Sequence, residues 1–503
     1  MPVKPNPTGS IDRVNPLVTS TAVTGNHPPQ AYLQKLWGYR DFRPPQGEIV
    51  ECLLAGQDAL IILPTGGGKS ICFQLPALMQ PGLTLVLSPL VALMENQVQE
   101  LWERHPRLKS QVAVLHSQRS AQERRQTLRA LEQGQLRLLY LSPETLLSPP
   151  VWERLCQPQL AIRRLVLDEA HCLTQWGETF RPSYYRLGAV RPALLAQKPP
   201  NQSIAIAAFT ATADPTAQAT IQRILQLQNP KIFRQNPYRS NLNLGVQVVW
   251  TPRQRRQCLL GVIRRHPHQS GLVYVRTRHD SEELAAWLQQ QGLATAAYHA
   301  GLSPRDRRQI EQQWLTGQLP FVICTCAFGM GINKPDCRWV LHFHAPLLLS
   351  EYVQEVGRAG RDGKTAIALT LISEPTGWLD HADKQRQQAF LAKERSQQQK
   401  AQQIARKLSP MGKADTVQQQ FRQDGAIALA LLHSAGQLDW QTPFDYEIQS
   451  RTVNLAATNA KAAEQMQRFL HSRNCRWALL LAAFGFPTET DAWRCGHCDN
   501  CRR

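Results

Sequence analysis

The fold is decided by residues 59–70, which read ALIILPTGGGKS. The first residues of this stretch are apolar and typical of a buried strand, and its end opens a segment with helical periodicity. Glycines allow backbone N–H groups to curl around phosphate oxygens, and a helix N-terminus adds partial positive charge. We therefore expect a strand–loop–helix unit that binds the phosphates of a nucleotide.

Each position of this loop has an expected role. Lys69 would hold the β- and γ-phosphates, and Ser70 would ligate Mg²⁺. The backbone of the loop would surround the phosphates, and its residues are Thr65, Gly66, Gly67 and Gly68. The strict phosphate-loop pattern has glycine where Leu63 stands, so this sequence is a variant of it.

On both sides of this loop, short apolar runs alternate with amphipathic stretches. The alternation extends from about residue 29 to 215 and resumes from 271 to 371. This rhythm is typical of parallel sheets with crossover helices. We predict an α/β fold with two parallel-sheet lobes, at residues 29–215 and 216–373, preceded by a disordered leader at 1–28.

The composition changes after residue 373. Gln, Lys, Arg and Ala dominate residues 384–424, which predicts a solvated helix or helical linker, with partial disorder as the alternative. An apolar helix at 426–433 and a hairpin at 438–448 then fit a winged-helix-like element. We assign residues 374–460 to this linker and 461–503 to a final, mostly helical segment.

Bulk properties limit the class of protein. The chain has 57 Lys and Arg against 38 Asp and Glu, a formal charge of +19, which fits either a polyanionic partner or a generally basic surface. No apolar run is long enough to span a membrane, and no secretion signal opens the chain. Eight scattered cysteines suit a reducing, cytoplasmic environment.

A second motif is acidic. Asp168 and Glu169 directly follow an apolar strand, so they should lie at the carboxyl edge of the sheet, where ligands bind in open α/β folds. Asp168 would position Mg²⁺, and Glu169 would orient and deprotonate the attacking water. An acidic strand end without a role is the alternative, which the phosphate loop upstream disfavours.

A third motif carries two arginines. Residues 354–361 read QEVGRAGR and fall in the second lobe. Arg358 and Arg361 are about one helical turn apart, so both can face a phosphate across a cleft and stabilise charge in the transition state. The string alone also fits a surface turn, but its place in a second α/β lobe favours an arginine finger supplied in cis.

Four cysteines cluster near the C-terminus with the spacing C-x19-C-x2-C-x2-C, and they are Cys475, Cys495, Cys498 and Cys501. This spacing brings four thiolates to one tetrahedral Zn²⁺. The alternative is one disulfide with spare thiols, which a cytosolic enzyme disfavours. His497 lies inside the cluster, but four thiolates already complete a structural site.

Together these motifs resemble the RecQ helicases, a branch of superfamily 2, from about residue 33 to 501. Further blocks follow in that family's order: WGYRDFRPPQ (37–46), SPLVALMENQ (88–97), YLSPE (140–144), FTATA (209–213), LVYVRTR (272–278), YHAGL (298–302), AFGMGINKPD (327–336) and QEVGRAGRDG (354–363). The resemblance implies two RecA-like lobes that bind ATP and Mg²⁺, and a zinc-binding segment. In the first block, Tyr39, Arg43 and Gln46 would recognise the nucleotide, with Gln46 reading adenine.

The residues that follow the acidic motif resemble the aromatic-rich loop of RecQ proteins. Trp176 and Phe180 offer ring faces on which a base can stack, and Arg181 offers a fork for a phosphate or a carboxylate. The alternative is that both rings pack beneath the loop. The family usually has His-Asp where Glu178 and Thr179 stand here.

The resemblance implies an ATP-dependent helicase that moves 3′→5′ on single-stranded DNA and unwinds duplex or forked DNA in recombination and repair. Expected partners are single-stranded and forked DNA, a single-stranded-DNA-binding protein and recombination proteins, in the cytoplasm near the nucleoid. The family often continues with further domains beyond the zinc segment, and this sequence ends at Arg503. An ATP-switched DNA-binding or strand-annealing scaffold with weak unwinding is therefore the alternative.

The hairpin at 438–448 also has two interpretations. As a strand-separation wedge, it would stack Trp440 or Phe444 on the first open base pair. Otherwise both aromatic rings pack in a local core.

Overall fold

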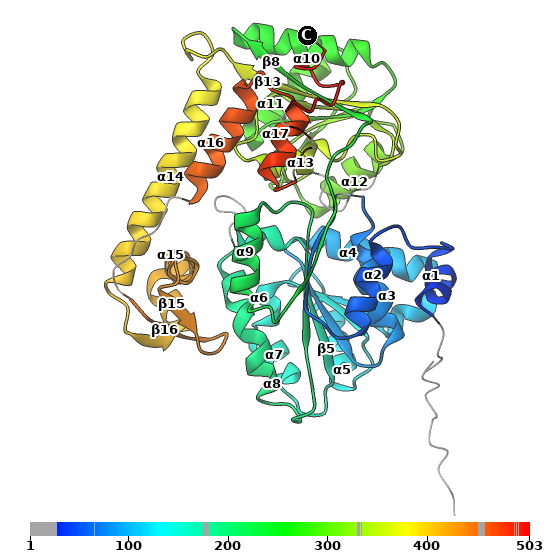
Figure 1. The fold of residues 1–503 in the computed structure, drawn as a ribbon, viewed down its shortest axis with the longest axis vertical. Helices are drawn as coiled ribbons and strands as arrows, with labels where there is room; N and C mark the ends of the chain where they lie inside the picture. The colour runs from blue at the N-terminus through cyan, green and yellow to red at the C-terminus, as the bar shows by residue number, and fades with distance from the viewer. Residues whose placement is uncertain are drawn as a thin grey trace, which may run out of the picture.

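The computed structural model describes residues 28–64, 66–174, 181–328, 332, 334–450, 458–486, 488, 490 and 492–502. It contains two parallel sheets with flanking helices, one above the other in Figure 1, and a smaller module beside them. This confirms the predicted α/β class with two parallel-sheet lobes and a helical C-terminal region. The predicted leader at 1–28 falls, apart from Pro28, outside the described residues.

The sheet of lobe 1 has seven strands in the order β3-β4-β2-β5-β6-β1-β7, and all its pairings are parallel. The strands are β1 (Ala59–Ile62), β2 (Leu83–Leu87), β3 (Val112–Leu115), β4 (Leu138–Leu141), β5 (Ile162–Leu167), β6 (Ala205–Thr210) and β7 (Lys231–Arg234). Central strands covered on both faces read as continuous apolar runs, which is why the sequence revealed them.

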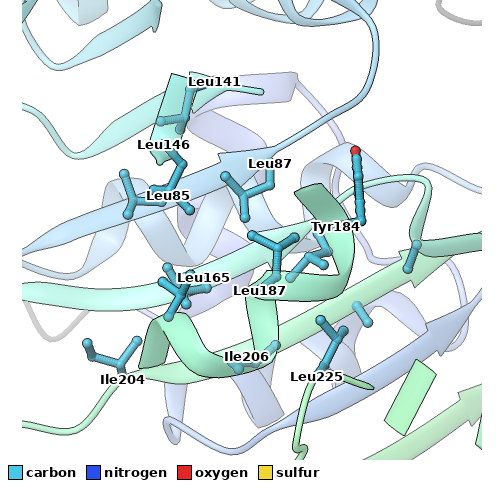
Figure 2. Packing of buried hydrophobic residues seen from close by; sticks show 14 of the residues in the cluster. Leu85, Leu87, Leu141, Leu146, Leu165, Tyr184, Leu187, Ile204, Ile206 and Leu225 are labelled. Atoms are coloured by element: carbon cyan, nitrogen blue, oxygen red, sulfur yellow. The ribbon is translucent and has the colours of Figure 1, made fainter. Parts of the chain in front are cut away.

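Helices cover both faces of this sheet. They are α1 (Pro29–Trp37), α2 (Gln46–Leu54), α3 (Lys69–Met79), α4 (Val91–Arg104), α5 (Ala121–Glu132), α6 (Pro143–Leu146), α7 (Pro149–Leu155), α8 (Val190–Leu195) and α9 (Pro215–Ile224), with 3-10 helices η1 (Pro106–Ser110), η2 (Ala170–Leu173) and η3 (Pro182–Ala189). In the core of one face, Leu85, Leu165 and Ile206 from three neighbouring strands meet Tyr184 and Leu187 of η3 (Figure 2).

Lobe 1 extends beyond residue 215, where the sequence analysis ended it. After α9 the chain returns as β7, which pairs in parallel with β1. This strand lies at the sheet edge and buries only Phe233, so it lacks the apolar run of a central strand. The connection between the lobes therefore lies between Arg234 and Leu242.

The sheet of lobe 2 has six parallel strands in the order β10-β11-β9-β12-β13-β8. The strands are β8 (Leu242–Val249), β9 (Ser270–Tyr274), β10 (Ala297–Tyr298), β11 (Phe321–Cys324), β12 (Cys337–His342) and β13 (Ala366–Ser373). The accompanying helices are α10 (Pro252–Arg265), α11 (Arg278–Gln290), α12 (Pro304–Leu315) and α13 (Leu349–Val356).

Residues 382–448 form a separate unit, which we call the winged-helix module. Its elements are α14 (Ala382–Ala405), β14 (Met411–Lys413), α15 (Ala414–Ser434), β15 (Leu438–Trp440) and β16 (Asp445–Ile448). The strands form an antiparallel sheet in the order β14-β16-β15. Arg422 has φ 53° and ψ −136°, so α15 is two helices joined at a kink. The order helix–strand–helix–helix–strand–strand is that of a winged helix.

Two helices follow the module, α16 (Thr458–His471) and α17 (Arg476–Ala483), and they pack on lobe 2. Met466 and Phe469 join the apolar core of that lobe, and the Trp477 indole donates to the Leu242 carbonyl at 3.1 Å. The final segment is therefore anchored to the first strand of lobe 2. Among the described residues, no helix has the length and apolar character needed to span a membrane.

Candidate active site

The phosphate loop connects β1 to α3 in the middle of lobe 1. Gly66 and Gly68 have φ values of 86° and 72°, a region that glycine adopts without strain. A Cβ at Gly68 would meet the Gln46 amide, so a larger residue here would displace that side chain from its hydrogen bonds. Thr65 lies outside the described residues.

Gln46 holds the first block of the sequence against the phosphate loop. Its side chain accepts from the Arg43 N–H at 3.0 Å and donates to the Gly67 carbonyl at 2.9 Å. The side chain is buried, whereas Arg43 is exposed and Tyr39 is 47% exposed. The structure therefore brings Gln46 to the loop and leaves the other two predicted residues on the nearby surface.

The two carboxylates lie at the carboxyl edge of β5, beside the phosphate loop. Asp168 donates its N–H to the Leu87 carbonyl at 2.8 Å, which aligns it with the neighbouring strand. The Lys69 ammonium lies 3.7 Å from Glu169 Oε1. Glu169 has φ 54°, a left-handed conformation that costs a non-glycine residue free energy and is concentrated at functional sites.

The two carboxyls differ in their ionisation. Burial, together with the charge of Glu169, raises the pKa of Asp168 to about 6. Burial also acts to raise the pKa of Glu169, but Lys69 and His171 outweigh it and lower the value to about 2. Asp168 is thus a buried carboxyl whose charged form is stabilised by a cation, and a carboxylate oxygen is a ligand that Mg²⁺ takes.

His171 connects three motifs and was not among the predicted site residues. Its Nδ1 lies 3.2 Å from Glu169 Oε2 and 3.4 Å from the Thr210 hydroxyl. The Gln354 amide of lobe 2 lies 3.2 Å from His171 Nε2. Thr210 and Gln354 stand in the quoted blocks 209–213 and 354–363, and that membership was the only signal in the sequence for these contacts.

Arg361 of lobe 2 lies beside the phosphate loop of lobe 1. The Arg361 side chain runs alongside Gly66, where a Cβ would lie 3.8 Å from Arg361 Cδ, and its Nη1 donates to the Ile332 carbonyl at 3.1 Å. Burial and the adjacent Arg358 lower the pKa of Arg361 to about 10, so Arg361 remains charged at neutral pH. Arg361 thus brings a cation of lobe 2 to the phosphate loop of lobe 1, and the charge of Arg358 acts on Glu169, whose pKa it lowers.

A buried ion pair holds the helix that precedes these arginines. Arg276 donates to both carboxylate oxygens of Glu355, at 2.9 and 2.8 Å, and His342 Nε2 lies 3.0 Å from Glu355 Oε2. Burial would raise the pKa of Glu355, but Arg276 and His342 lower it to about 2. Glu355 follows Gln354 in α13, so the pair fixes this part of the helix, and no local pattern in the sequence indicates the pair.

Of the predicted DNA-contacting residues, only Arg181 is described; Trp176 and Phe180 lie outside the described residues. Arg181 Nη1 lies 3.6 Å from Glu144 Oε1, and the same oxygen accepts from the Ser183 hydroxyl at 2.6 Å. Arg181 therefore faces a carboxylate in the 140–144 block and not the nucleotide loop.

The four clustered cysteines converge with zinc-site geometry. Their Sγ atoms all lie within 4.8 Å of one another, and those of Cys495 and Cys501 are 3.9 Å apart. Zn–S bonds of 2.3 Å give a tetrahedron with edges of about 3.8 Å. All twelve cysteines of the chain are free, which excludes the disulfide alternative. His497 bonds to the Tyr238 hydroxyl at 3.1 Å and stands outside the ligand set.

Three protein-family models match the chain. A DEAD/DEAH box helicase model covers residues 43–220, a helicase conserved C-terminal domain covers 254–363, and a RecQ zinc-binding model covers 444–502, which includes all four cysteines. A curated relative, the ATP-dependent DNA helicase RecQ of Synechocystis, is 51% identical over 471 residues, 93% of this chain and 97% of that protein. The chain belongs to the RecQ helicase family.

Two further comparisons are with a second curated helicase and with a solved structure. The probable ATP-dependent DNA helicase RecS of Bacillus subtilis is 39% identical over 68% of this chain and 66% of that protein. A structure of the Mycobacterium smegmatis helicase Lhr, bound to single-stranded DNA and AMP-PNP, has a TM-score of 0.54 and 21% identity, and covers 68% of this chain and 47% of that one. The last comparison supports the two-lobe fold alone.

Proposed function

We propose that this RecQ protein hydrolyses ATP between its two lobes and uses the energy to move 3′→5′ along single-stranded DNA and unwind duplex or forked DNA. The observation that carries the proposal is the convergence of Lys69 and Glu169 from lobe 1 with Arg361 from lobe 2. Lobe 1 supplies a cation and a carboxylate, and lobe 2 supplies a second cation. This arrangement suits a reaction in which the lobes close around a triphosphate.

In this proposal the phosphate loop and its flanking residues bind the nucleotide. Thr65 and Gly66–Gly68 surround the phosphates, and Lys69 holds the β- and γ-phosphates. Asp168 and Ser70 hold Mg²⁺, which neutralises developing charge on the phosphates when it is bound. Tyr39, Arg43 and Gln46 lie on the side where the base is recognised.

Glu169 acts as the base that orients the attacking water. Its lowered pKa keeps it ionised at neutral pH, so it can accept a hydrogen bond from water at all times. Arg358 and Arg361 stabilise charge on the transferred phosphoryl group, as an arginine finger supplied in cis. His171 and Gln354 carry the state of this site from lobe 1 to lobe 2.

For the DNA side, we propose that Trp176 and Phe180 stack on bases and that Arg181 links their loop to the 140–144 block. The positive charge of the chain supplies attraction for the phosphate backbone. The four cysteines hold a structural Zn²⁺ that fastens the final segment to lobe 2.

The packing of the two aromatic rings of the hairpin favours the alternative function, a scaffold with weak unwinding. Trp440 is 7% exposed within the module, and the Phe444 ring packs edge-on against Trp152 of lobe 1 at 5.2 Å. Neither ring is presented for stacking on an open base pair, so the predicted wedge interpretation is not the arrangement found. A helicase of this kind has to separate strands elsewhere.

Strand displacement on a fork with a 3′ tail tests the proposal. We expect ATP-dependent release of the displaced strand, and none from the matched fork with a 5′ tail. Lys69→Ala should abolish release and ATP turnover, because it removes the cation that binds the phosphates. ATP-dependent binding or annealing without strand release would favour the scaffold.

We also propose lobe limits of 29–234 and 235–373, which follow the sheets, and an action on forked DNA with recombination proteins in the cytoplasm near the nucleoid. A single-stranded-DNA-binding protein is a proposed partner. Affinity capture from native cells, with and without nuclease treatment, tests both the partners and the location.

A further inference from the structure

The winged-helix module packs on lobe 1, although it follows lobe 2 in the chain. The matched family models leave residues 364–443, and so most of this module, uncovered. Figure 1 shows α14 running from lobe 2 to α15, which lies beside lobe 1. With 24 residues, α14 spans about 36 Å at 1.5 Å per residue. The module therefore forms a second connection between the lobes, in addition to the chain between β7 and β8.

At its lobe 2 end, the connection begins at a buried ion cluster. Arg255 Nη2 lies 2.7 Å from Asp380 Oδ2 and 3.4 Å from Asp383 Oδ2, and it donates to the Ser373 hydroxyl at 2.9 Å. Arg255 and Asp380 are both buried. Breaking a buried, hydrogen-bonded pair is costly, so this end of α14 is fixed to lobe 2.

At its lobe 1 end, the module is held by apolar and aromatic contacts. Ala430 of α15 belongs to the core of lobe 1, and Ala189 of η3 belongs to the core of the module. The Arg186 guanidinium lies 5.3 Å from the centre of the Trp440 ring. The two units share parts of their cores, so their contact is a packed interface and not a surface encounter.

The second half of α15 occupies the position of the recognition helix in a winged helix. This half is buried from Ile427 to His433. Its carboxyl end is capped by lobe 1, since Arg223 at the end of α9 donates to the carbonyls of His433 at 3.3 Å and Ser434 at 2.7 Å. A cation at this end also complements the helix dipole. The helix that reads DNA in many winged-helix proteins is thus committed to lobe 1.

A short path joins this interface to the catalytic carboxylates. The ring of Tyr185 in η3 packs edge-on against His433 of the module at 6.4 Å. The hydroxyl of Tyr185 donates to the Leu173 carbonyl at 2.8 Å. Leu173 ends η2, which begins directly after Glu169. In the chain, η2 lies before residues 175–180 and η3 lies after them.

We infer that the winged-helix module is an interlobe brace that positions the segment between the catalytic carboxylates and residue 174. Tyr185 is the positioning residue, and it acts through Leu173 on the backbone that carries Glu169. The inference rests on the proposed role of Glu169 in ATP hydrolysis. When the module is packed on lobe 1, its contact with Tyr185 fixes the position of η3. The hydrogen bond from Tyr185 to Leu173 then fixes η2.

The test uses the full-length protein, single-stranded DNA and four variants. Arg223→Ala removes the cap on α15, and Arg223→Lys restores a cation at the same place. Tyr185→Phe keeps the ring against His433 but removes the hydroxyl that reaches Leu173. The matched control is Arg406→Ala, which removes an exposed arginine from the module.

Two measurements are made on each variant: steady-state ATPase kinetics and amide hydrogen exchange. We expect Arg223→Ala to lower the DNA-stimulated kcat about tenfold, because its charge-assisted hydrogen bonds to α15 are lost, with KM for ATP changed less than twofold. Its exchange should rise both in the second half of α15 and in residues 170–173. Tyr185→Phe should lower kcat similarly, with faster exchange in residues 170–173.

Arg223→Lys should recover most of the lost kcat, and Arg406→Ala should match wild type; thermal melts confirm that each variant folds. The inference is overturned if Arg223→Ala speeds exchange in α15 while kcat stays within twofold of wild type. It is equally overturned if exchange in α15 does not change, because docking then does not depend on this contact. Absence of DNA-stimulated ATPase in wild type would instead refute the proposed function.

Discussion

Two of the interfaces of lobe 1, with lobe 2 and with the winged-helix module, differ in their chemistry. Toward lobe 2 the contacts are polar, such as the Gln354 amide on His171 and an ion pair of Glu95 with Arg308 at 3.8 Å. Toward the winged-helix module most contacts are apolar and aromatic, such as Phe444 on Trp152, and the Arg223 hydrogen bonds at the end of α15 add to them. Two surfaces of one lobe thus serve different purposes.

Polar contacts can be exchanged for water or for a nucleotide at little net cost, because each group finds a new partner. An exposed pair such as Glu95 and Arg308 contributes little to stability. Separating packed apolar surfaces leaves them without partners, and the free energy rises with the area exposed. We therefore expect the interface with lobe 2 to change during ATP turnover and the interface with the module to persist.

The largest expected effect lies in the polar cleft. Glu169→Gln should lower the DNA-stimulated kcat by about 10²- to 10⁴-fold and leave ATP binding intact, because the amide cannot accept a proton from water. Steady-state ATPase and equilibrium nucleotide binding measure the two properties. Glu153→Gln, which changes an exposed carboxyl of lobe 1, is the matched control. Normal turnover in Glu169→Gln would contradict the assignment.

The next effect concerns a third junction, between the zinc segment and lobe 2. Cys498→Ser should reduce bound zinc from about one per chain to nearly none and lower the thermal midpoint, because metal binding supplies folding free energy to such segments. Metal analysis and thermal melts measure both, with Cys156→Ser as a control for a scattered thiol. Full zinc content in Cys498→Ser would reject the four-thiolate site.

A smaller effect is expected for the hydrogen bond across the cleft. Gln354→Ala should lower kcat by up to about tenfold, because a neutral hydrogen bond contributes on the order of 1 kcal/mol. Thermal stability should stay the same, since the contact is one of those that change during turnover. Gln388→Ala in the exposed part of α14 is the control. A large drop in thermal midpoint would show that this contact holds the lobes together permanently.

The smallest effect tests the apolar interface. Trp152→Ala, Phe444→Ala and the double variant form a cycle whose coupling energy should be about 0.5–1.5 kcal/mol, typical of an aromatic pair. The quantity measured is the free energy of opening of α15, obtained from hydrogen exchange with and without nucleotide. The coupling should be the same in both conditions. A coupling that vanishes with nucleotide would mean that the module undocks during the cycle.

Several features were accessible from the sequence because they depend on neighbours along the chain. The loop at 59–70 needs only a strand, glycines and a helix start, and these are consecutive. The carboxylates follow β5 directly, and the spacing of the cysteines alone is enough to predict their convergence. Both sheets were visible because parallel strands buried on two faces read as apolar runs, whereas the edge strand β7 escaped notice because it buries one residue.

The tertiary structure alone decided which distant residues meet. His171 and Gln354 are 183 positions apart, and Arg223 and Ser434 are 211 apart. No local pattern encodes such contacts, because they depend on strand order, on the relative position of two lobes and on the surface to which α15 packs. The sequence determined the chemistry of each lobe and the zinc ligands. Packing determined that the aromatic rings of the hairpin are buried and that the winged-helix module is docked on lobe 1, since burial of apolar surface selects the complementary face and has no directional code along the chain.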